Sequence, residues 1–189
     1  MPEPVRNAVF RLCRELLSPR GLAFISHNTL PGWHVRGVIR QLLQRNLPSG
    51  GTPAERAAAA RRYLEGLATH APAEWSQVAR MIQSEIELIR PLSDRYLFHE
   101  HLAEGNHPVW FSDFQAQALQ YLGDAELHAT LPSRYGAQAE EWILRDQPDL
   151  LTLESRLDEV GLRFFRRSLL CHGEAEIDRV LRVDQLAGH

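Results

Sequence analysis

Residues 21–33, Gly21-Leu-Ala-Phe-Ile-Ser-His-Asn-Thr-Leu-Pro-Gly-Trp33, are the stretch on which the interpretation of this chain depends. The apolar run from Leu22 to Ile25 is short and uninterrupted, and turn-forming residues bound it on both sides. Such a run is typical of a strand that is buried on both faces of a parallel sheet. Ligands of these sheets bind beyond the carboxyl ends of the strands. The stretch therefore predicts a functional edge that begins at Ser26.

The residues before this strand predict a helix over residues 3–17, because apolar side chains recur there at helical spacing. Helix, tight turn and strand together form half of an alternating unit, the kind that builds doubly wound sheets. No second buried strand is evident, although residues 164–171 fit either a strand or a continuing helix. Because a lone strand leaves backbone groups unpaired, we expect residues 22–26 to pair with a second copy or to tuck against helices, with dimerisation favoured.

After Trp33 the pattern becomes almost wholly helical. Thr52, Pro53 and Glu55 form the signature of a capping box. Apolar periodicity predicts further helices up to Gly161. They are expected over residues 35–43, 53–67, 75–89, 94–102, 112–122, 133–145 and 150–160. The predicted fold class is mainly α: a helical bundle preceded by one helix and one strand of an α/β sheet, with a boundary between residues 1–33 and 34–189.

Composition limits the function further. The 189 residues are 44% apolar and 24% charged, with a formal charge of −3, so nothing suggests the basic surface of a nucleic-acid-binding protein. No apolar run approaches the roughly 20 residues that span a bilayer, and the amino terminus does not resemble a signal peptide. Cys13 and Cys171 are too few and too distant for a disulfide framework. We therefore expect a cytoplasmic protein.

Two local patterns suggest chemistry that their geometry does not favour. His99 and His101 are two residues apart, and on a helix such side chains point roughly 200° apart, whereas helical zinc ligands are four apart. Ser26 and His27 are adjacent in a predicted strand and so face opposite sides of the sheet. The sequence predicts neither a metal site nor a Ser-His dyad.

Longer stretches carry a resemblance to a known family. Ser26-His-Asn-Thr-Leu-Pro-Gly-Trp-His-Val-Arg36, Tyr96-Leu-Phe-His-Glu-His-Leu-Ala-Glu-Gly-Asn106 and Leu119-Gln-Tyr-Leu-Gly-Asp-Ala-Glu-Leu127 occur in this order, followed by Phe165-Arg-Arg-Ser-Leu-Leu-Cys-His172 as a weaker match. They resemble bacterial methyltransferases that carry a methyltransferase regulatory domain. The resemblance covers nearly the whole chain, from about Val5 to about Val180.

The resemblance implies part of a Rossmann-like, S-adenosylmethionine-dependent enzyme similar to protein lysine methyltransferases. Residues 1–33 would be the C-terminal remnant of the catalytic domain, and residues 34–189 the helical regulatory domain. The Gly-rich turn and the ribose-binding acidic residue of such enzymes are absent from the sequence. We therefore expect this chain alone to be inactive and to bind no cofactor, whereas the complete enzyme would use S-adenosylmethionine.

The implied partners are the missing catalytic half or a separate methyltransferase chain, a protein substrate, and a second copy of this chain. Two alternatives stay open. One is a free-standing helical interaction module descended from such an enzyme. The other is a fragment of a complete methyltransferase whose start is wrongly assigned.

The resemblance and the predicted strand end suggest six residues of a substrate cleft. They are His27, Asn28, Trp33, Tyr96, His99 and Glu100. Imidazole and amide groups can accept hydrogen bonds from an amine, and an indole can stack on a cation. Each residue also has a structural interpretation: Asn28 turns the chain, Trp33 packs the sheet onto the bundle, and the others cap helices or form surface hydrogen bonds. At His27 the family usually has tyrosine.

Overall fold

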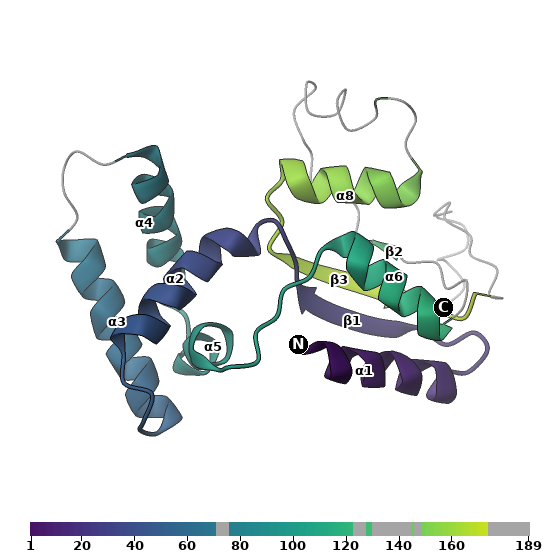
Figure 1. Ribbon diagram of the computed structural model, residues 1–189, viewed down its shortest axis with the longest axis horizontal. Helices are drawn as coiled ribbons and strands as arrows, with labels where there is room; N and C mark the ends of the chain where they lie inside the picture. Colours follow the sequence, from purple (N-terminus) through teal and green to yellow (C-terminus); the bar gives the residue numbers. More distant parts are fainter. Residues whose placement is uncertain (71–75, 123–127, 130–144, 146–148, 174–189) are drawn as a thin grey trace, which may run out of the picture.

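The computed structural model describes residues 1–70, 76–122, 128–129, 145 and 149–173, and this part of the chain is mainly helical, as predicted (Figure 1). One group of elements, the sheet unit, combines strands and helices. It comprises α1 (Glu3–Leu16), β1 (Ala23–Asn28), α6 (Phe111–Leu122), β2 (His128–Ala129), α8 (Leu150–Val160) and β3 (Phe165–Leu170). The other group, the helical unit, comprises α2 (Trp33–Asn46), α3 (Pro53–Thr69), α4 (Gln77–Ile89), α5 (Asp94–Leu97) and the π-helix η1 (Phe98–Leu102).

The predicted strand pairs within the chain, which corrects one expectation. β1 runs antiparallel to β3, with Ile25 opposite Ser168, and the sheet has the order β1-β3-β2. No second copy is needed to supply this partner. The sequence hid the pairing because β3 lies far along the chain and carries two arginines in its middle, which interrupt the apolar pattern of a buried strand.

The sheet is covered on one face, which we call the inner face. Ile25 and Leu170 point there and share a buried core with Phe10 of α1 and Phe114 of α6. α8 also packs on this side, since Arg166 of β3 bonds its acidic residues. Figure 1 shows α1, α6 and α8 lying along the sheet.

The opposite, outer face is exposed in the described residues. Phe24 is 63% exposed and Phe165 is 40% exposed, and Ser26 and Arg167 between them are exposed as well. The prediction of a strand buried on both faces was therefore wrong for the described part of the chain. Alternate residues of β1 face the core and the solvent.

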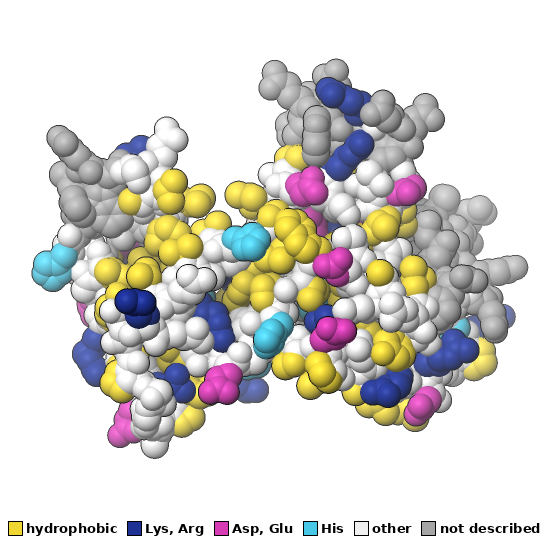
Figure 2. All heavy atoms as spheres, viewed as in Figure 1, with side chains coloured by type: hydrophobic (Ala, Val, Ile, Leu, Met, Phe, Trp, Pro, Cys, Tyr) yellow, Lys and Arg dark blue, Asp and Glu magenta, His cyan; other side chains and the backbone are white. Residues whose placement is uncertain are grey.

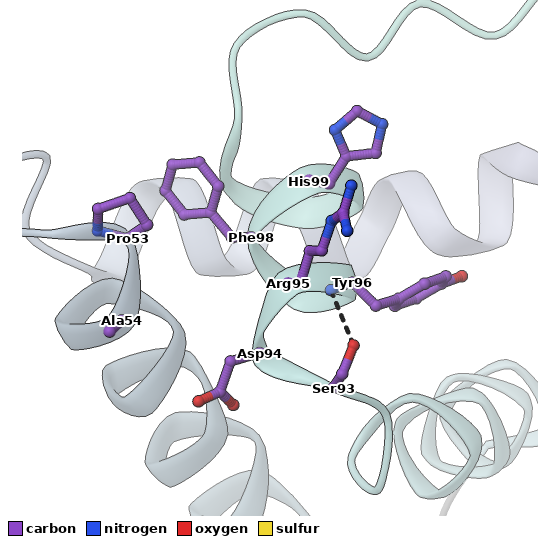
Figure 3. A pocket seen from close by; sticks show the side chains of 8 residues that line it. All are labelled: Pro53, Ala54, Ser93, Asp94, Arg95, Tyr96, Phe98 and His99. Carbon is purple, nitrogen blue, oxygen red and sulfur yellow. Dashed lines mark hydrogen bonds between the residues drawn. The ribbon is translucent and has the colours of Figure 1, made fainter.

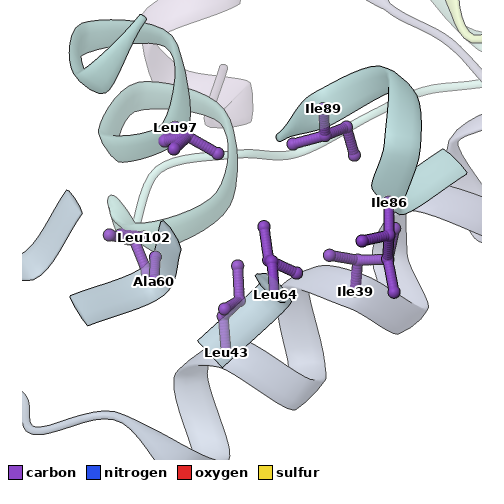
Figure 4. Packing of buried hydrophobic residues seen from close by; sticks show 8 residues of the cluster. All are labelled: Ile39, Leu43, Ala60, Leu64, Ile86, Ile89, Leu97 and Leu102. Carbon is purple, nitrogen blue, oxygen red and sulfur yellow. The ribbon is translucent and has the colours of Figure 1, made fainter. Parts of the chain in front are cut away.

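The helical unit has a separate apolar core. Each of the five elements of the unit contributes buried residues to this core, and Figure 4 shows these side chains converging. They are Ile39, Leu43, Ala60, Leu64, Ile86, Ile89, Leu97 and Leu102. The capping box of Thr52 and Glu55 opens α3 as predicted. α5 begins at Asp94 as predicted, with Ser93 as its N-cap, and α6 begins at Phe111, one residue before the predicted start. The helix expected over residues 133–145 lies outside the described residues, except for residue 145.

The two units join at the turn after β1. Gly32 donates its N–H to the carbonyl of Arg163 at 3.1 Å, and a Cβ at this position would lie 1.9 Å from the carbonyl oxygen of Leu162. Only glycine allows this approach between the start of α2 and the loop before β3. The joint therefore depends on a residue of the sequence stretch that first indicated the fold.

Candidate functional site

Three polar side chains meet at the carboxyl end of β1. Asn28 donates from Nδ2 to Glu100 Oε2 at 2.7 Å and to Asn106 Oδ1 at 3.1 Å. Asn106 donates from Nδ2 to the same Glu100 oxygen at 3.1 Å and to the Glu100 carbonyl at 2.9 Å. We call these residues the Glu100 cluster. They bring together parts of the chain more than 70 residues apart.

The end of β1 is fixed by backbone pairing on both sides. The Thr29 N–H donates to the Phe164 carbonyl at 3.0 Å, and its hydroxyl donates to the Val109 carbonyl at 2.9 Å. Since Thr29 is fully buried, these bonds hold the backbone that presents Asn28.

The π-helix η1 presents Glu100 to Asn28. Arg40 of α2 donates from its guanidinium to the carbonyls of Glu100, Ala103 and Glu104, which lie at the end of η1. Carbonyls at a helix end lack partners within the helix, and Arg40 satisfies them here. Burial lowers the pKa of Arg40, and the nearby Glu100 carboxylate opposes that effect. The guanidinium thus holds the backbone of η1, and the Glu100 side chain stays with the asparagines.

Tyr96 lies in a second polar group, on the helical unit. Its hydroxyl accepts from Arg36 Nη1 at 2.7 Å, and Arg36 also pairs with Glu85 at 2.6 Å. The Arg36 guanidinium stacks over Phe164, 3.6 Å from the ring centroid. Burial raises the pKa of the Tyr96 hydroxyl. This group ties α2, α4 and α5 to the loop before β3, which is a structural role.

Trp33 is buried against His101. Trp33 is 3% exposed, and its ring stacks with the His101 imidazole at 6.1 Å between centroids. Burial lowers the pKa of His101 to about 4, with Arg36 and Arg40 acting in the same direction. Because Trp33 is enclosed, the described structure supports its packing role over a solvent-facing channel wall.

Hydrophobic side chains remain exposed beside this buried pair. Trp110 is 40% exposed, and its ring meets that of His34 edge to face with 6.3 Å between the ring centroids. Phe164 is 41% exposed. Figure 2 shows hydrophobic side chains gathered where the start of α2 meets the sheet unit. The joint between the units thus has an apolar surface on the face shown.

His27 points away from the Glu100 cluster. It lies on the inner face, 8% exposed, and stacks on Phe114 with centroids 3.9 Å apart. Burial lowers its pKa to about 3, and the positive charge of Arg166 contributes. Neither ring nitrogen has a hydrogen-bond partner in the described residues. The structure therefore does not bring His27 to the other candidates.

Arg166 forms the centre of a buried ionic group on the same face. Its guanidinium bonds Asp158 at 2.7 Å and Glu154 at 2.8 Å, and it lies 3.7 Å from the centroid of Phe111. Arg163 adds a second ion pair to Asp158 at 3.1 Å. These bonds attach α8 to β3 and neutralise charges that burial would otherwise destabilise.

His99 and Tyr96 line an open cavity of about 720 Å³ between the start of α3 and the α5–η1 segment (Figure 3). Pro53, Ala54 and Phe98 supply apolar lining. The His99 side chain is 80% exposed, and its Nε2 lies 3.9 Å from Glu100 Oε1. His99 is thus the predicted residue that lies between this cavity and the Glu100 cluster.

The structure joins two of the predicted residues directly, Asn28 and Glu100, and places His99 beside them. Sequence reasoning missed Asn106 and Arg40. Asn106 was not among the predicted site residues, although it closes the same eleven-residue block that contains Glu100. That shared block was the available signal.

Metal ligands and a glycine turn open to a cofactor are two further features by which a site can be recognised. Within the ranges given above, no group of three or more His, Cys, Asp or Glu side chains is placed to hold a metal ion. Gly32, the glycine next to the end of β1, is packed against the backbone of Leu162 and leaves no space for a phosphate-like or ribose group.

Comparison with known proteins identifies the family. Residues 93–172 match the family model described as "Predicted methyltransferase regulatory domain". This segment is therefore similar to a methyltransferase regulatory domain. The match begins at the cap of α5 and ends after β3, so it includes Glu100, Asn106 and the buried Arg166 group.

Longer proteins resemble the regulatory domain together with the residues before it. Uncharacterized protein RP789 of Rickettsia prowazekii is 31% identical over 190 residues, which cover 98% of this chain and 34% of that protein. Uncharacterized protein RP028 of the same organism is 30% identical over 114 residues, which cover 60% of this chain and 46% of that protein. The chain therefore spans less than half the length of these relatives.

Solved structures show the same fold. PKMT2 from Rickettsia typhi superimposes with a TM-score of 0.81 at 26% identity, over 98% of this chain and 36% of that chain. Its complex with AdoHcy gives a TM-score of 0.78 at the same identity and coverage. In the described part of our chain, no helix is long and apolar enough to cross a membrane.

Proposed function

We propose that this chain is the regulatory and substrate-recognition region of a class I S-adenosylmethionine-dependent methyltransferase of the protein lysine type. It would act together with a part that binds the methyl donor. In such an enzyme a neutral substrate amine attacks the donor methyl group, and the protein contributes positioning and exclusion of water. AdoHcy, the product form of that donor, is bound by the structurally similar PKMT2.

The observation that carries the proposal is the half-covered sheet. β1 is outermost in the order β1-β3-β2, so in the described residues it is paired with a strand on one side only, and on its other edge only its carboxyl end is engaged, where the Asn28 carbonyl accepts from the Val109 N–H at 3.2 Å. An unpaired edge is a template for another strand. Sheets of Rossmann-like enzymes are covered on both faces, whereas the outer face here exposes Phe24 and Phe165.

The occupant we propose for this edge and face is the donor-binding part. The chain matches about a third of PKMT2 and of RP789, so both relatives have ample further chain to supply strands and helices. A parallel strand beside β1 would put the carboxyl ends of both strands at one edge, where the Glu100 cluster lies. The division at residues 33 and 34 belongs to this proposal, with the first part continuing the catalytic sheet.

The compartment belongs to the proposal as well. Cys13 and Cys171 are both free thiols in the structure. Free thiols fit a reducing compartment, and we therefore place the protein in the cytoplasm.

A hybrid enzyme tests the proposed function. This chain replaces the matched 36% of R. typhi PKMT2, and methyl transfer to protein is measured with labelled S-adenosylmethionine. We expect transfer by the hybrid and none by this chain alone. Phe24→Asp should lower transfer more than about tenfold because it buries an unpaired charge. Leu88→Asp is the matched control, since Leu88 of α4 has the same 63% exposure, and should change transfer less than about twofold.

Two results would contradict the proposal. The first is a folded hybrid that binds the donor and is unaffected by Phe24→Asp. The second is measurable heat when this chain alone is titrated with S-adenosylmethionine, because the donor site would then lie within it. Light scattering on this chain alone tests the competing occupant, a second copy of the chain. A dimer that Phe24→Asp converts to a monomer would assign the β1 edge to that second copy.

A further inference from the structure

Glu100 is a shielded carboxylate with no arginine ion pair among the described residues, although the Arg40 guanidinium lies near enough for the carboxylate to oppose the lowering of its pKa. Its side chain is 16% exposed. The nearest basic group recorded among the described residues is His99 Nε2, 3.9 Å from Oε1, on a side chain that is itself 80% exposed. Shielded carboxylates are ordinarily paired with a cation or saturated with hydrogen bonds. Here neither condition is met for one of the two oxygens.

The two carboxylate oxygens have different surroundings. Oε2 accepts from Asn28 at 2.7 Å and from Asn106 at 3.1 Å. Oε1 accepts no hydrogen bond from the described residues. The Asn28 amide oxygen likewise accepts none there, because Asn28 uses its nitrogen for both of its bonds. The cluster thus holds one carboxylate oxygen and leaves one acceptor unused on each of two hydrogen-bonded side chains, Glu100 and Asn28.

An ammonium group already lies within electrostatic reach of this carboxylate. Burial and the charge of Arg6 lower the pKa of the Met1 amino group, and Glu100 opposes them. The Met1 nitrogen nevertheless bonds the His107 carbonyl at 3.5 Å rather than the carboxylate. The Met1 amino group thus forms no recorded hydrogen bond with Oε1.

The location of the cluster is that of a ligand site. Asn28 is the last residue of β1 and lies on the outer face, opposite Phe165 in the register. The described strands are antiparallel, but in the parallel sheet that the proposed function implies beside β1, ligands bind beyond the carboxyl ends of the strands. Glu100 lies on a π-helix, and single π turns within helices occur frequently at functional sites.

We propose that the Glu100 cluster binds a primary ammonium group, with Glu100 Oε1 and Asn28 Oδ1 as its acceptors and Asn106 as the residue that orients the carboxylate. An ammonium has three donors, and a carboxylate with a neighbouring amide oxygen satisfies two of them while a third remains for solvent or a partner. The chemistry is shared by a lysine side chain and by the α-ammonium of an amino acid such as that of the methyl donor. The identity of the amine rests on the proposed function, whereas the site itself is a property of this chain.

Side-chain amide resonances of the chain test the site directly. The 189-residue chain is titrated with three probes, and the Asn28 and Asn106 NH₂ signals are followed by ¹H–¹⁵N correlation spectra. Nα-acetyl-lysinamide carries only the side-chain ammonium, norleucinamide only the α-ammonium, and Nα-acetyl-norleucinamide neither. We expect a saturable shift with one ammonium probe, which identifies the source, and no shift with the neutral probe.

Matched variants assign the effect to the carboxylate. Glu100→Gln should weaken binding by about tenfold or more, since it replaces a charge-assisted bond with a neutral one. Glu104→Gln, at an exposed glutamate just beyond η1, should leave binding unchanged. Absence of a saturable shift with both ammonium probes in the parent chain would overturn the proposal, even if Glu100→Gln fails to fold. A folded Glu100→Gln variant that binds as the parent does would overturn it too. The titration contains neither the methyl donor nor a catalytic part, so it can succeed even if the hybrid enzyme transfers no methyl group. Failure of the proposed function is thus distinguishable from failure of the ammonium site.

Discussion

The two units of the molecule differ in what their interiors contain. The helical unit closes around aliphatic side chains such as Leu43 and Leu64, which are completely buried. The sheet unit buries Arg166 with Glu154 and Asp158, and it leaves Phe24 exposed on its outer face. An apolar core is complete without further partners, whereas a sheet with one bare face is not. The exposed outer face of the sheet unit is the observation on which the proposal of a donor-binding part rests.

Removal of the buried guanidinium should have the largest effect. Arg166→Ala leaves two buried carboxylates without a cation and is expected to lower the free energy of unfolding by about 3–5 kcal/mol. Urea unfolding followed by circular dichroism measures the loss. Arg167→Ala, the exposed neighbour on the outer face, should change it by less than about 0.5 kcal/mol. Equal effects at the two positions would mean that the ionic group does not hold α8 to the sheet.

Truncation in the aliphatic core tests the helical unit in the same way. Leu43→Ala is expected to cost about 2–5 kcal/mol, because the buried site of α2 loses contacts and leaves a cavity. Val38→Ala in the same helix, at a residue 43% exposed, should cost less than about 1 kcal/mol. Thermal unfolding monitored by calorimetry compares the two. If Leu43→Ala were as mild as Val38→Ala, the helical unit would lack the tight core that distinguishes it.

A glycine substitution tests the joint between the units. Gly32→Ala places a Cβ on the Leu162 carbonyl and should lower the unfolding free energy by about 1–3 kcal/mol. Gly37→Ala in α2 meets no atom within 4 Å, and it should be neutral or stabilise the chain by up to about 1 kcal/mol, since alanine favours helix. Chemical unfolding at one temperature gives both values. A harmless Gly32→Ala would show that the units are not packed as described.

Each unit buries one imidazole, His101 in the helical unit and His27 in the sheet unit, and this predicts a dependence of stability on pH. Their folded pKa values, about 4 and about 3, lie below the unfolded value of 6.5, so the unfolded chain binds more protons between these limits. The free energy of unfolding should therefore be greatest above about pH 6.5 and fall as the pH is lowered towards 4, by up to about 1.4 kcal/mol per pH unit for each histidine.

Replacement of one imidazole at a time separates the two contributions. His101→Phe should reduce the slope of the unfolding free energy between pH 7 and pH 5, whereas His99→Asn, at an exposed residue, should not. Urea unfolding at several pH values measures this slope for each variant. An unchanged slope in His101→Phe would mean that this imidazole is not buried in its neutral form.

The local signals in the sequence predicted most of the helices well. The capping box at Thr52 and the helix from Leu150 to Val160 were confirmed because they depend on neighbours within a few residues. The pairing of β1 with β3 could not be predicted, since it joins segments about 140 residues apart and one of the inward residues of β3 is an arginine. A buried arginine is indistinguishable in sequence from an exposed one until its carboxylate partners are placed.

The candidate site was predictable in part for the same reason. Asn28 was selected from its position after a strand, and Glu100 from a family resemblance, but nothing in the sequence joined them. His27 was selected with Asn28, yet adjacent strand residues face opposite sides, and the packed side received His27. Which face of β1 is covered depends on α1 and α6, and this is a tertiary property.

Hydrogen exchange in β1 tests most directly the claim that the sheet unit is completed by a donor-binding part. Exchange of residues 23–28 is measured in this chain alone and in the hybrid that contains the remainder of PKMT2. In the chain alone, the account predicts rapid exchange of the β1 amides that point away from β3. In the hybrid these amides should exchange slowly, at rates comparable to those of β3. A hybrid that binds S-adenosylmethionine while β1 exchanges as in the isolated chain would contradict the account.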